Sequence, residues 1–323
     1  LAGVIAGRFN SLAGAMHLFA FTAITVCGVT GLIRVRRRGL LFGALVSAIS
    51  LIIGVVGSRA YLTRSMEGLS HEDSILNRIQ PQLPQVDTVL LEKTEPFADV
   101  PAEGETILDR ILRRGVLRVV FGAEKVPFAY LNTDAQPAGF DIEMAHQLAA
   151  DLGVSLELVP LYIDDVQDFR DEGQFDVMMT GVIANAERYR DWTLTQAYLE
   201  VSPAIVVPDH LRERFNSMER VRDETFSLGV INEPSFLRLA ERHLPKATII
   251  PVHRFEDFFA GKIPEADALL MTAEEGSAWT LRHPAFHVAT PWKGNPKWPL
   301  VYLLGQDDPG MRQFLDDWIQ LKR

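Results

Sequence analysis

The sequence has very little cysteine and lacks the usual motifs of metal, nucleotide and hydrolase sites. Cys27 is the one cysteine among 323 residues, so no disulfide can form within the chain, and cysteine usage does not reveal the redox compartment. The eight histidines are scattered, and the patterns HxH, HExxH and CxxC do not occur. GxSxG and a phosphate-binding glycine loop are also missing. The sequence therefore predicts no metal and no cofactor, which weighs against catalysis without excluding it.

Acidic residues and lysine are absent from residues 1–64, which hold seven arginines. The rest of the chain carries 25 basic and 42 acidic side chains, a formal charge of −17. A remainder this acidic does not attract polyanions, so we expect no nucleic-acid partner. Because single hydrophobic cores stop growing at about 250–300 residues, a chain of this length predicts more than one domain.

Two segments near the N-terminus contain no formally charged residue. Residues 11–33 and 39–58 span 23 and 20 residues, and a helix needs roughly 20 to cross the hydrocarbon layer. We predict a transmembrane helical hairpin within residues 1–64. The basic turn at 34–38 favours the cytoplasmic side, so both outer ends of the hairpin face out. A buried helical hairpin of a soluble domain is the alternative interpretation.

Three further features belong to this N-terminal part. His17 lies inside the first predicted span and is a functional candidate there, although a neutral histidine bonded to a neighbouring helix explains it equally well. The chain begins with Leu1 rather than methionine, and residues 1–7 are apolar, which indicates a fragment of a longer protein. Residues 65–104 mix acidic residues with prolines and lack sustained periodicity, so we predict a surface linker.

The stretch 139–160, GFDIEMAHQLAADLGVSLELVP, predicts a helix, a tight turn and a strand. Apolar residues recur there at steps of three and four, and Gly153 stands where helices end in a left-handed residue. Apolar strands are predicted on either side, at 115–122 and 175–181. A capped helix is predicted from Thr106 to Gly115. Strands separated by helices indicate an α/β fold with a parallel sheet.

The second half of the chain repeats this alternation. The apolar strand at 202–208 is predicted to cross to a second lobe. Within that lobe we predict strands at 226–231, 247–252 and 266–271 and helices at 234–245 and 255–262. Residues 286–290 are predicted to return the chain, before a strand at 298–305 and a last helix at 309–323. Two α/β lobes joined by two crossing segments form a hinge that closes on a ligand.

This order of elements resembles the bacterial extracellular solute-binding proteins of family 3, which bind amino acids and related small solutes. The resemblance depends on RRGVLRVVFG, VPFAYLN, GFDIEMAHQLAADLG, GQFDVMMTG and the arginine of NAER, in that order. It implies a two-lobed periplasmic binding protein type II fold. The first lobe would comprise residues 105–205 and 290–323, and the second lobe residues 206–289.

Arg188 is the strongest candidate for a ligand contact. A guanidinium is a planar fork that holds a carboxylate by two parallel hydrogen bonds. Arg188 lies twelve residues after Asp176, the spacing of the family's carboxylate-binding arginine, so the resemblance implies that it binds the solute carboxylate. The alternative is a surface arginine paired with Glu187 or Asp191.

The other first-lobe contacts also come from the resemblance. It implies a backbone cradle, an aromatic wall and a residue that selects the ligand's side chain, at Gly181 and Ile183, at Phe128 and Tyr130, and at Glu124. Core packing is the alternative for the two aromatic residues. Asp141 is expected to be structural, and for Trp279 and Trp298 core packing and pocket lining both remain open.

The second lobe departs from the family's pattern at one contact. Ser235 lies in the first turn of a helix, where free N–H groups attract anions. Amino-acid binders of the family have an aspartate five residues after an aspartate in the strand ADALL, to hold the α-ammonium group. Counting from Asp267 gives Thr272, whose uncharged hydroxyl is a weak partner. Either Glu274 or Glu275 takes this role, or the ligand lacks an amino group, which leaves dicarboxylates open.

These features predict a membrane-tethered domain that captures a small carboxylate-bearing solute, an amino acid or a dicarboxylate, for a transporter. With the two spans, the chain resembles bacterial fusions in which a cation:dicarboxylate symporter precedes a family 3 domain, so a transporter module is expected upstream. We expect the bacterial inner (cytoplasmic) membrane as the location, with the domain on the periplasmic side. One alternative is an enzyme similar to cyclohexadienyl dehydratase, with Glu274 or Glu275 as general acid. Another is a sensory receptor.

Overall fold

The computed structural model describes residues 85–93, 97, 104–162, 174–294 and 296–322. The chain divides into two units, 1–70 and 71–323, and the described residues belong to the second. In these ranges no helix has the length and apolar character needed to cross a membrane. The predicted spans at 11–33 and 39–58 lie outside the described residues, so the transmembrane hairpin stays a prediction.

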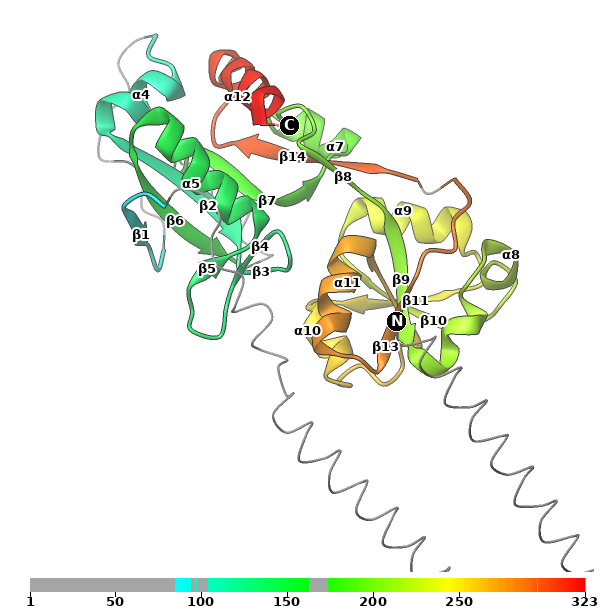
Figure 1. The fold of residues 1–323 in the computed structure, drawn as a ribbon. Helices are drawn as coiled ribbons and strands as arrows, with labels where there is room; N and C mark the ends of the chain where they lie inside the picture. Colours follow the sequence, from blue (N-terminus) through cyan, green and yellow to red (C-terminus); the bar gives the residue numbers. More distant parts are fainter. Residues whose placement is uncertain (1–84, 94–96, 98–103, 163–173, 295, 323) are drawn as a thin grey trace, which may run out of the picture. The chain divides into compact units, whose positions relative to one another are not determined.

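The first sheet has six strands in the order β1-β6-β2-β7-β14-β8 (Figure 1). Their bounds are Thr88–Leu90 (β1), Val116–Gly122 (β2), Ser155–Leu161 (β6), Val177–Ile183 (β7), Leu199–Val201 (β8) and Trp298–Leu304 (β14). Strands β1, β6, β2 and β7 run parallel, while β14 is antiparallel to both of its neighbours. The predicted parallel sheet is confirmed. We call this sheet and its helices the first lobe.

Two helices of the first lobe begin and end where the sequence predicts. In α4 (Ile107–Arg114), the Thr106 hydroxyl accepts from the Asp109 N–H at 3.1 Å, and the Asp109 carboxylate accepts from the Thr106 N–H at 3.2 Å. Helix α5 (Phe140–Leu152) ends at Gly153, whose φ is +68°. The other helices are α7 (Ala186–Asp191) and α12 (Pro309–Lys322). A short ribbon completes the lobe, with β3 (Glu124–Lys125), β4 (Ala129–Leu131) and β5 (Pro137–Ala138).

The second sheet has five strands in the order β11-β10-β12-β9-β13. Their bounds are Pro203–Pro208 (β9), Ser227–Ile231 (β10), Thr248–Val252 (β11), Ala268–Thr272 (β12) and Phe286–Ala289 (β13). Strand β10 is parallel to β11 and β12, and β9 is antiparallel to β12 and β13. Its helices are η2 (Asp209–Arg214), α8 (Met218–Val221), α9 (Pro234–His243), α10 (Phe255–Phe259) and α11 (Ala273–Arg282). We call this sheet and its helices the second lobe.

Four details differ from the sequence-based expectation. Strand β1 lies inside the predicted linker and pairs with β6 at the edge of the sheet. It was not predicted because three extended residues are too few to show a period. The second sheet begins at Pro203, three residues before the predicted boundary, so Ser202 is the crossing point. Strand β13 pairs with β9 rather than crossing, and the chain returns after it. Helix α7 forms where only a turn was expected, since Asn185 caps it.

Candidate functional site

The Arg188 guanidinium binds a carboxylate that comes from the second lobe. Its Nη2 donates to Oε2 of Glu233 at 2.6 Å, and its Nη1 donates to Oε1 at 3.3 Å. Two bonds to one carboxylate are the fork geometry expected of a carboxylate-binding arginine. The alternative partners bind elsewhere, because Glu187 pairs with Arg238 at 2.7 Å and Asp191 with Arg190 at 2.8 Å.

Local hydrogen bonds fix the direction of this guanidinium. The Asn185 side chain accepts from the Arg188 N–H at 2.9 Å, which sets the start of α7. The Ile183 carbonyl, at the end of β7, accepts from Arg188 Nη1 at 2.6 Å. Ile183 therefore positions the arginine through its carbonyl, whereas the sequence suggested that its backbone holds the ligand.

Glu233 accepts from both groups that the sequence predicted to bind a carboxylate, Arg188 and the Ser235 N–H. It is the N-cap of α9, where it accepts from the Ser235 N–H at 3.2 Å, and it also accepts from Asn185 Nδ2 at 3.4 Å. Arg188 and the Ser235 N–H thus converge on one carboxylate of the protein, and their predicted binding of a solute carboxylate stays a prediction. Sequence reasoning missed Glu233, and the available signal was an acidic residue directly before a helix-initiating proline.

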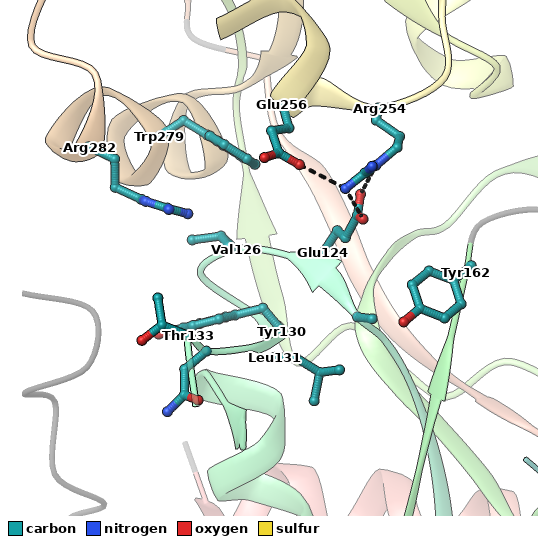
Figure 2. A pocket seen from close by; sticks show the side chains of 12 residues that line it. Glu124, Val126, Tyr130, Leu131, Thr133, Tyr162, Arg254, Glu256, Trp279 and Arg282 are labelled. Atoms are coloured by element: carbon teal, nitrogen blue, oxygen red, sulfur yellow. Dashed lines mark hydrogen bonds and ion pairs between the residues drawn. The ribbon is translucent and has the colours of Figure 1, made fainter. Parts of the chain in front are cut away.

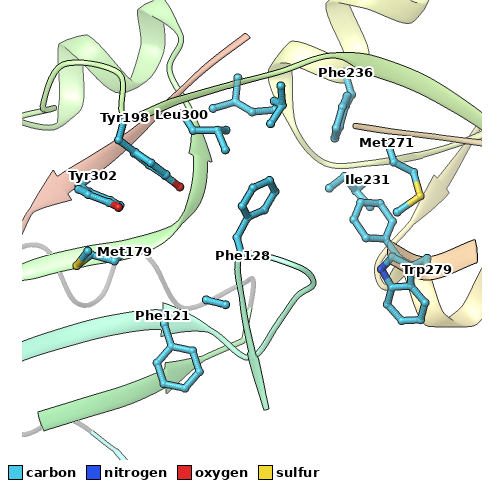
Figure 3. Close-up of a cluster of buried hydrophobic side chains, with 14 of the residues drawn as sticks. Phe121, Phe128, Met179, Tyr198, Ile231, Phe236, Met271, Trp279, Leu300 and Tyr302 are labelled. Atoms are coloured by element: carbon cyan, nitrogen blue, oxygen red, sulfur yellow. The ribbon is translucent and has the colours of Figure 1, made fainter. Parts of the chain in front are cut away.

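Gly181 lies against the side chain of Phe128. Gly181 has a φ of +62°, and a Cβ built on it would lie 2.7 Å from Cδ2 of Phe128. Its N–H donates to Asp141 Oδ2 at 2.7 Å, so in this structure the cradle expected at Gly181 holds a protein carboxylate. Figure 3 shows Phe128, which is 3% exposed, in one buried cluster with Met179 and Tyr198. Core packing, the alternative for Phe128, describes this environment.

Asp141 is structural, as expected, and has unusual electrostatics for an aspartate. It is fully buried and accepts from Tyr198 Oη at 2.9 Å and Tyr302 Oη at 3.4 Å. Burial raises the pKa of Asp141 to about 7, although the hydrogen bonds from Tyr198 and Gly181 oppose this rise. The same burial, together with the nearby carboxylate, raises the pKa values of both tyrosines well above 10.

Glu124 and Tyr130 line a cavity of about 270 Å³ that has walls from both lobes (Figure 2). Glu124 pairs with Arg254 at 2.5 Å, and Arg254 also bonds Glu256 at 2.7 Å. Burial raises the pKa of Tyr130, with Arg282 opposing the shift. This cavity is therefore aromatic on one side and has a charge-compensated rim.

The two tryptophans separate into one that lines the cavity and one that does not. Trp279 contributes to the cavity wall (Figure 2) while its ring stacks on Phe259, with centroids 5.0 Å apart. Both alternatives considered for Trp279 hold, since the ring is 6% exposed and packs on one face. Trp298 packs against Phe236, with centroids 5.3 Å apart, and is not among the cavity-lining residues.

The three polar residues predicted at the start of α11 serve the fold. The Thr272 hydroxyl accepts from the Glu275 N–H at 3.1 Å and donates to its carboxylate at 2.9 Å. Glu274 accepts from the N–H of Ser202, the crossing point between the sheets, at 3.1 Å. Lys125 Nζ lies 4.0 Å from Glu275. Within the described residues, no group of His, Cys, Asp and Glu side chains is arranged to hold a metal ion.

Comparisons with known proteins identify relatives of this arrangement. The family of bacterial extracellular solute-binding proteins, family 3, matches residues 117–321. Cyclohexadienyl dehydratase from Pseudomonas aeruginosa is 31% identical over 227 residues, which cover 67% of this chain and 81% of the relative. Membrane-bound lytic murein transglycosylase F from Vibrio cholerae is 33% identical over 108 residues, 33% of this chain and 20% of that protein.

Solved structures show the same fold. An ancestral amino acid-binding protein, a precursor of cyclohexadienyl dehydratase, has a TM-score of 0.59 and 26% identity over 67% of this chain and 93% of its own. An amino acid ABC transporter substrate-binding protein from Streptococcus pneumoniae, bound to L-arginine, has a TM-score of 0.58 and 21% identity. That match covers 66% of this chain and 90% of the other.

Proposed function

Because the chain belongs to the bacterial extracellular solute-binding proteins of family 3, we propose that it captures a small carboxylate-bearing solute with Arg188 as the anchor. One observation carries this proposal. Arg188 and the Ser235 N–H converge on a single carboxylate, that of Glu233, in the bidentate geometry that carboxylate recognition requires. A solute carboxylate has the same shape and charge, so these donors suit it equally well.

The site has the partial burial that makes such a contact effective. The Arg188 side chain is 27% exposed, and that of Glu233 is 12% exposed. A charge pair at this depth is screened less by water and salt than one at the surface, so exchanging one carboxylate for another keeps most of the interaction. The cavity lined by Tyr130 and Trp279 offers an aromatic wall for a carbon skeleton, although neither Arg188 nor Glu233 is among its lining residues.

The cellular setting is part of the proposal. The domain would work on the extracytoplasmic side of the bacterial inner membrane, tethered by the predicted spans at 11–33 and 39–58, and would deliver solute to a transporter module in the same chain. Tethering has a physical advantage, because a short flexible joint replaces the bulk receptor concentration by an effective one of about mM.

A thermal-shift screen of the full chain in detergent, with amino acids and dicarboxylates, tests the proposal. A bound solute should raise the melting temperature of the parent protein, and Arg188→Ala should abolish this rise because the fork is lost. Arg190→Ala is the matched control, since Arg190 lies on the same helix with its side chain 73% exposed. Equal stabilisation of Arg188→Ala and the parent would show the anchor to be wrong.

Because the chain is 31% identical in sequence to the P. aeruginosa dehydratase, an enzymatic function is the second candidate. Its general acid would be Glu275, which is 5% exposed and close to Lys125, or the neighbouring Glu274. Both glutamates are engaged in structural hydrogen bonds here, so we expect no turnover of prephenate or arogenate by the full chain. Turnover that disappears in Glu275→Gln or Glu274→Gln would establish the enzyme instead.

A further inference from the structure

Glu233 occupies the donors that a solute carboxylate needs. Both terminal nitrogens of Arg188 already bond its carboxylate, and Nη1 additionally bonds the Ile183 carbonyl. A guanidinium edge holds one carboxylate in this bidentate manner. A solute can therefore reach Arg188 by this route only when Glu233 leaves it.

Displacing Glu233 from Arg188 leaves the Glu233 carboxylate without a cationic partner unless the solute supplies one. Arg188 and Glu233 together are neutral, whereas Arg188 with a solute monocarboxylate leaves Glu233 as an unpaired, mostly buried anion. Removing one partner of such a pair costs far more than the pair itself contributes. The neutral donors that remain, Asn185 Nδ2 and the Ser235 N–H, do not compensate a full charge.

The other carboxylates that were candidates for an ammonium group are committed elsewhere. Thr272 has no charge, and its hydroxyl is bonded to Glu275. The Glu275 carboxylate completes the cap of α11, and Glu274 bonds the Ser202 backbone. Glu233 differs from them because its main partner is the very group that the solute would take over.

We propose that Glu233 exchanges partners when solute binds: the solute carboxylate replaces it on Arg188, and the released Glu233 pairs with a cationic group of the same solute. The exchange rests on the proposed function and narrows the class of solutes that the site accepts. A zwitterion leaves the total charge of the site at zero, while a dicarboxylate adds two negative charges beside Glu233. The site thus selects amino acids over dicarboxylates.

The test compares amino acids with analogues that lack only the ammonium group, using calorimetry on the full chain in detergent. The probe pairs are L-norvaline with pentanoate and L-leucine with 4-methylpentanoate. In the parent protein, we expect the better-bound amino acid to bind at least tenfold more tightly than its analogue. In Glu233→Gln, the analogue should bind at least tenfold more tightly than it binds the parent, and the preference for the amino acid should fall at least tenfold.

The variants separate this exchange from other effects. Gln keeps a side-chain oxygen that can accept from the Ser235 N–H, so the start of α9 is preserved. Glu187→Gln is the matched control, because it also removes a glutamate paired with an α9 arginine, but at an exposed position. The control should retain the parent's preference.

Each outcome decides one of the two proposals. An analogue that binds the parent as tightly as its amino acid overturns the exchange without any variant being needed. A preference unchanged in Glu233→Gln also overturns it, and if binding still requires Arg188, the proposed function stands. Binding that is equal in Arg188→Ala and the parent removes both.

Discussion

Gly181 donates its N–H to the carboxylate of Asp141 at 2.7 Å, across 40 residues of sequence. This bond joins β7, just before the Arg188 segment, to the first turn of α5. Tyr302 on β14 bonds the same carboxylate, so three elements meet at one buried acid. The backbone that leads to Arg188 is consequently held by a titratable group.

Asp141 should make stability fall as the pH rises from about 4 to about 7. Its pKa is about 7 in the folded protein against an ordinary 3.8, so the folded state keeps a proton that the unfolded chain releases in this window. The stabilising contribution of Asp141 is fully present below about pH 4, decreases between pH 4 and pH 7, and is absent at higher pH. Its upper size is about 4 kcal/mol, at about 1.4 kcal/mol per pH unit.

Asp141→Asn tests this dependence, because the asparagine does not titrate. Urea unfolding followed by tryptophan fluorescence reports on this domain, since all five tryptophans lie between residues 192 and 318. The stability of the parent minus that of the variant should decrease between pH 4.5 and pH 8. Asp176, whose pKa burial raises to about 6, is present in both proteins and cancels. A constant difference across this range contradicts the prediction.

Gly181→Ala should destabilise the protein more than Gly153→Ala. Both glycines have left-handed backbone, with φ of +62° and +68°, but only at Gly181 would the new Cβ meet another group, Phe128. We expect a loss of about 1 kcal/mol at Gly153 from backbone strain alone and about 2–4 kcal/mol at Gly181 from strain plus overlap. Phe128→Leu combined with Gly181→Ala should recover part of the difference in urea unfolding. Equal losses would mean that the Phe128 contact has no energetic role.

Thr272→Ala should cost stability without affecting solute binding. Thr272 is 2% exposed and forms a reciprocal capping box with Glu275, so alanine removes the cap and leaves a buried carboxylate short of a donor. We expect a loss of about 1–3 kcal/mol, against about 1 kcal/mol for Thr106→Ala in the more exposed capping box of α4. Solute-induced thermal shifts should match the parent's. Loss of those shifts would return Thr272 to the ligand site.

Phe97→Ala should weaken the first lobe although residues 65–104 were expected to be a surface linker. The guanidinium carbons of Arg114 and Arg118 lie 3.8 and 4.2 Å from the Phe97 ring centroid. We expect a loss of about 1–2 kcal/mol, and Phe97→Leu should retain the apolar part but not the cation–π part. Unfolding free energies in urea measure both. No loss in Phe97→Ala would support the linker interpretation.

Local sequence determined the elements of the two lobes. The Thr106–Asp109 capping box and the glycine that ends α5 act over a few residues, so their conformations follow from residue type and spacing. The alternation of apolar strands and amphipathic helices likewise requires only a period. Strand β1 was not predicted because three residues do not establish a period.

The partners of the charged side chains were decided by the tertiary structure alone. Sequence pointed to Arg188 and to the Ser235 N–H as carboxylate donors, but Glu233, 45 residues from Arg188, reaches them only because α7 and α9 come from different lobes that meet there. In the same way, Asp141 takes the Gly181 N–H through the packing of α5 beside β7. A residue's type fixes what it can bind, whereas the partner that it does bind depends on which distant segment the fold brings within hydrogen-bonding distance.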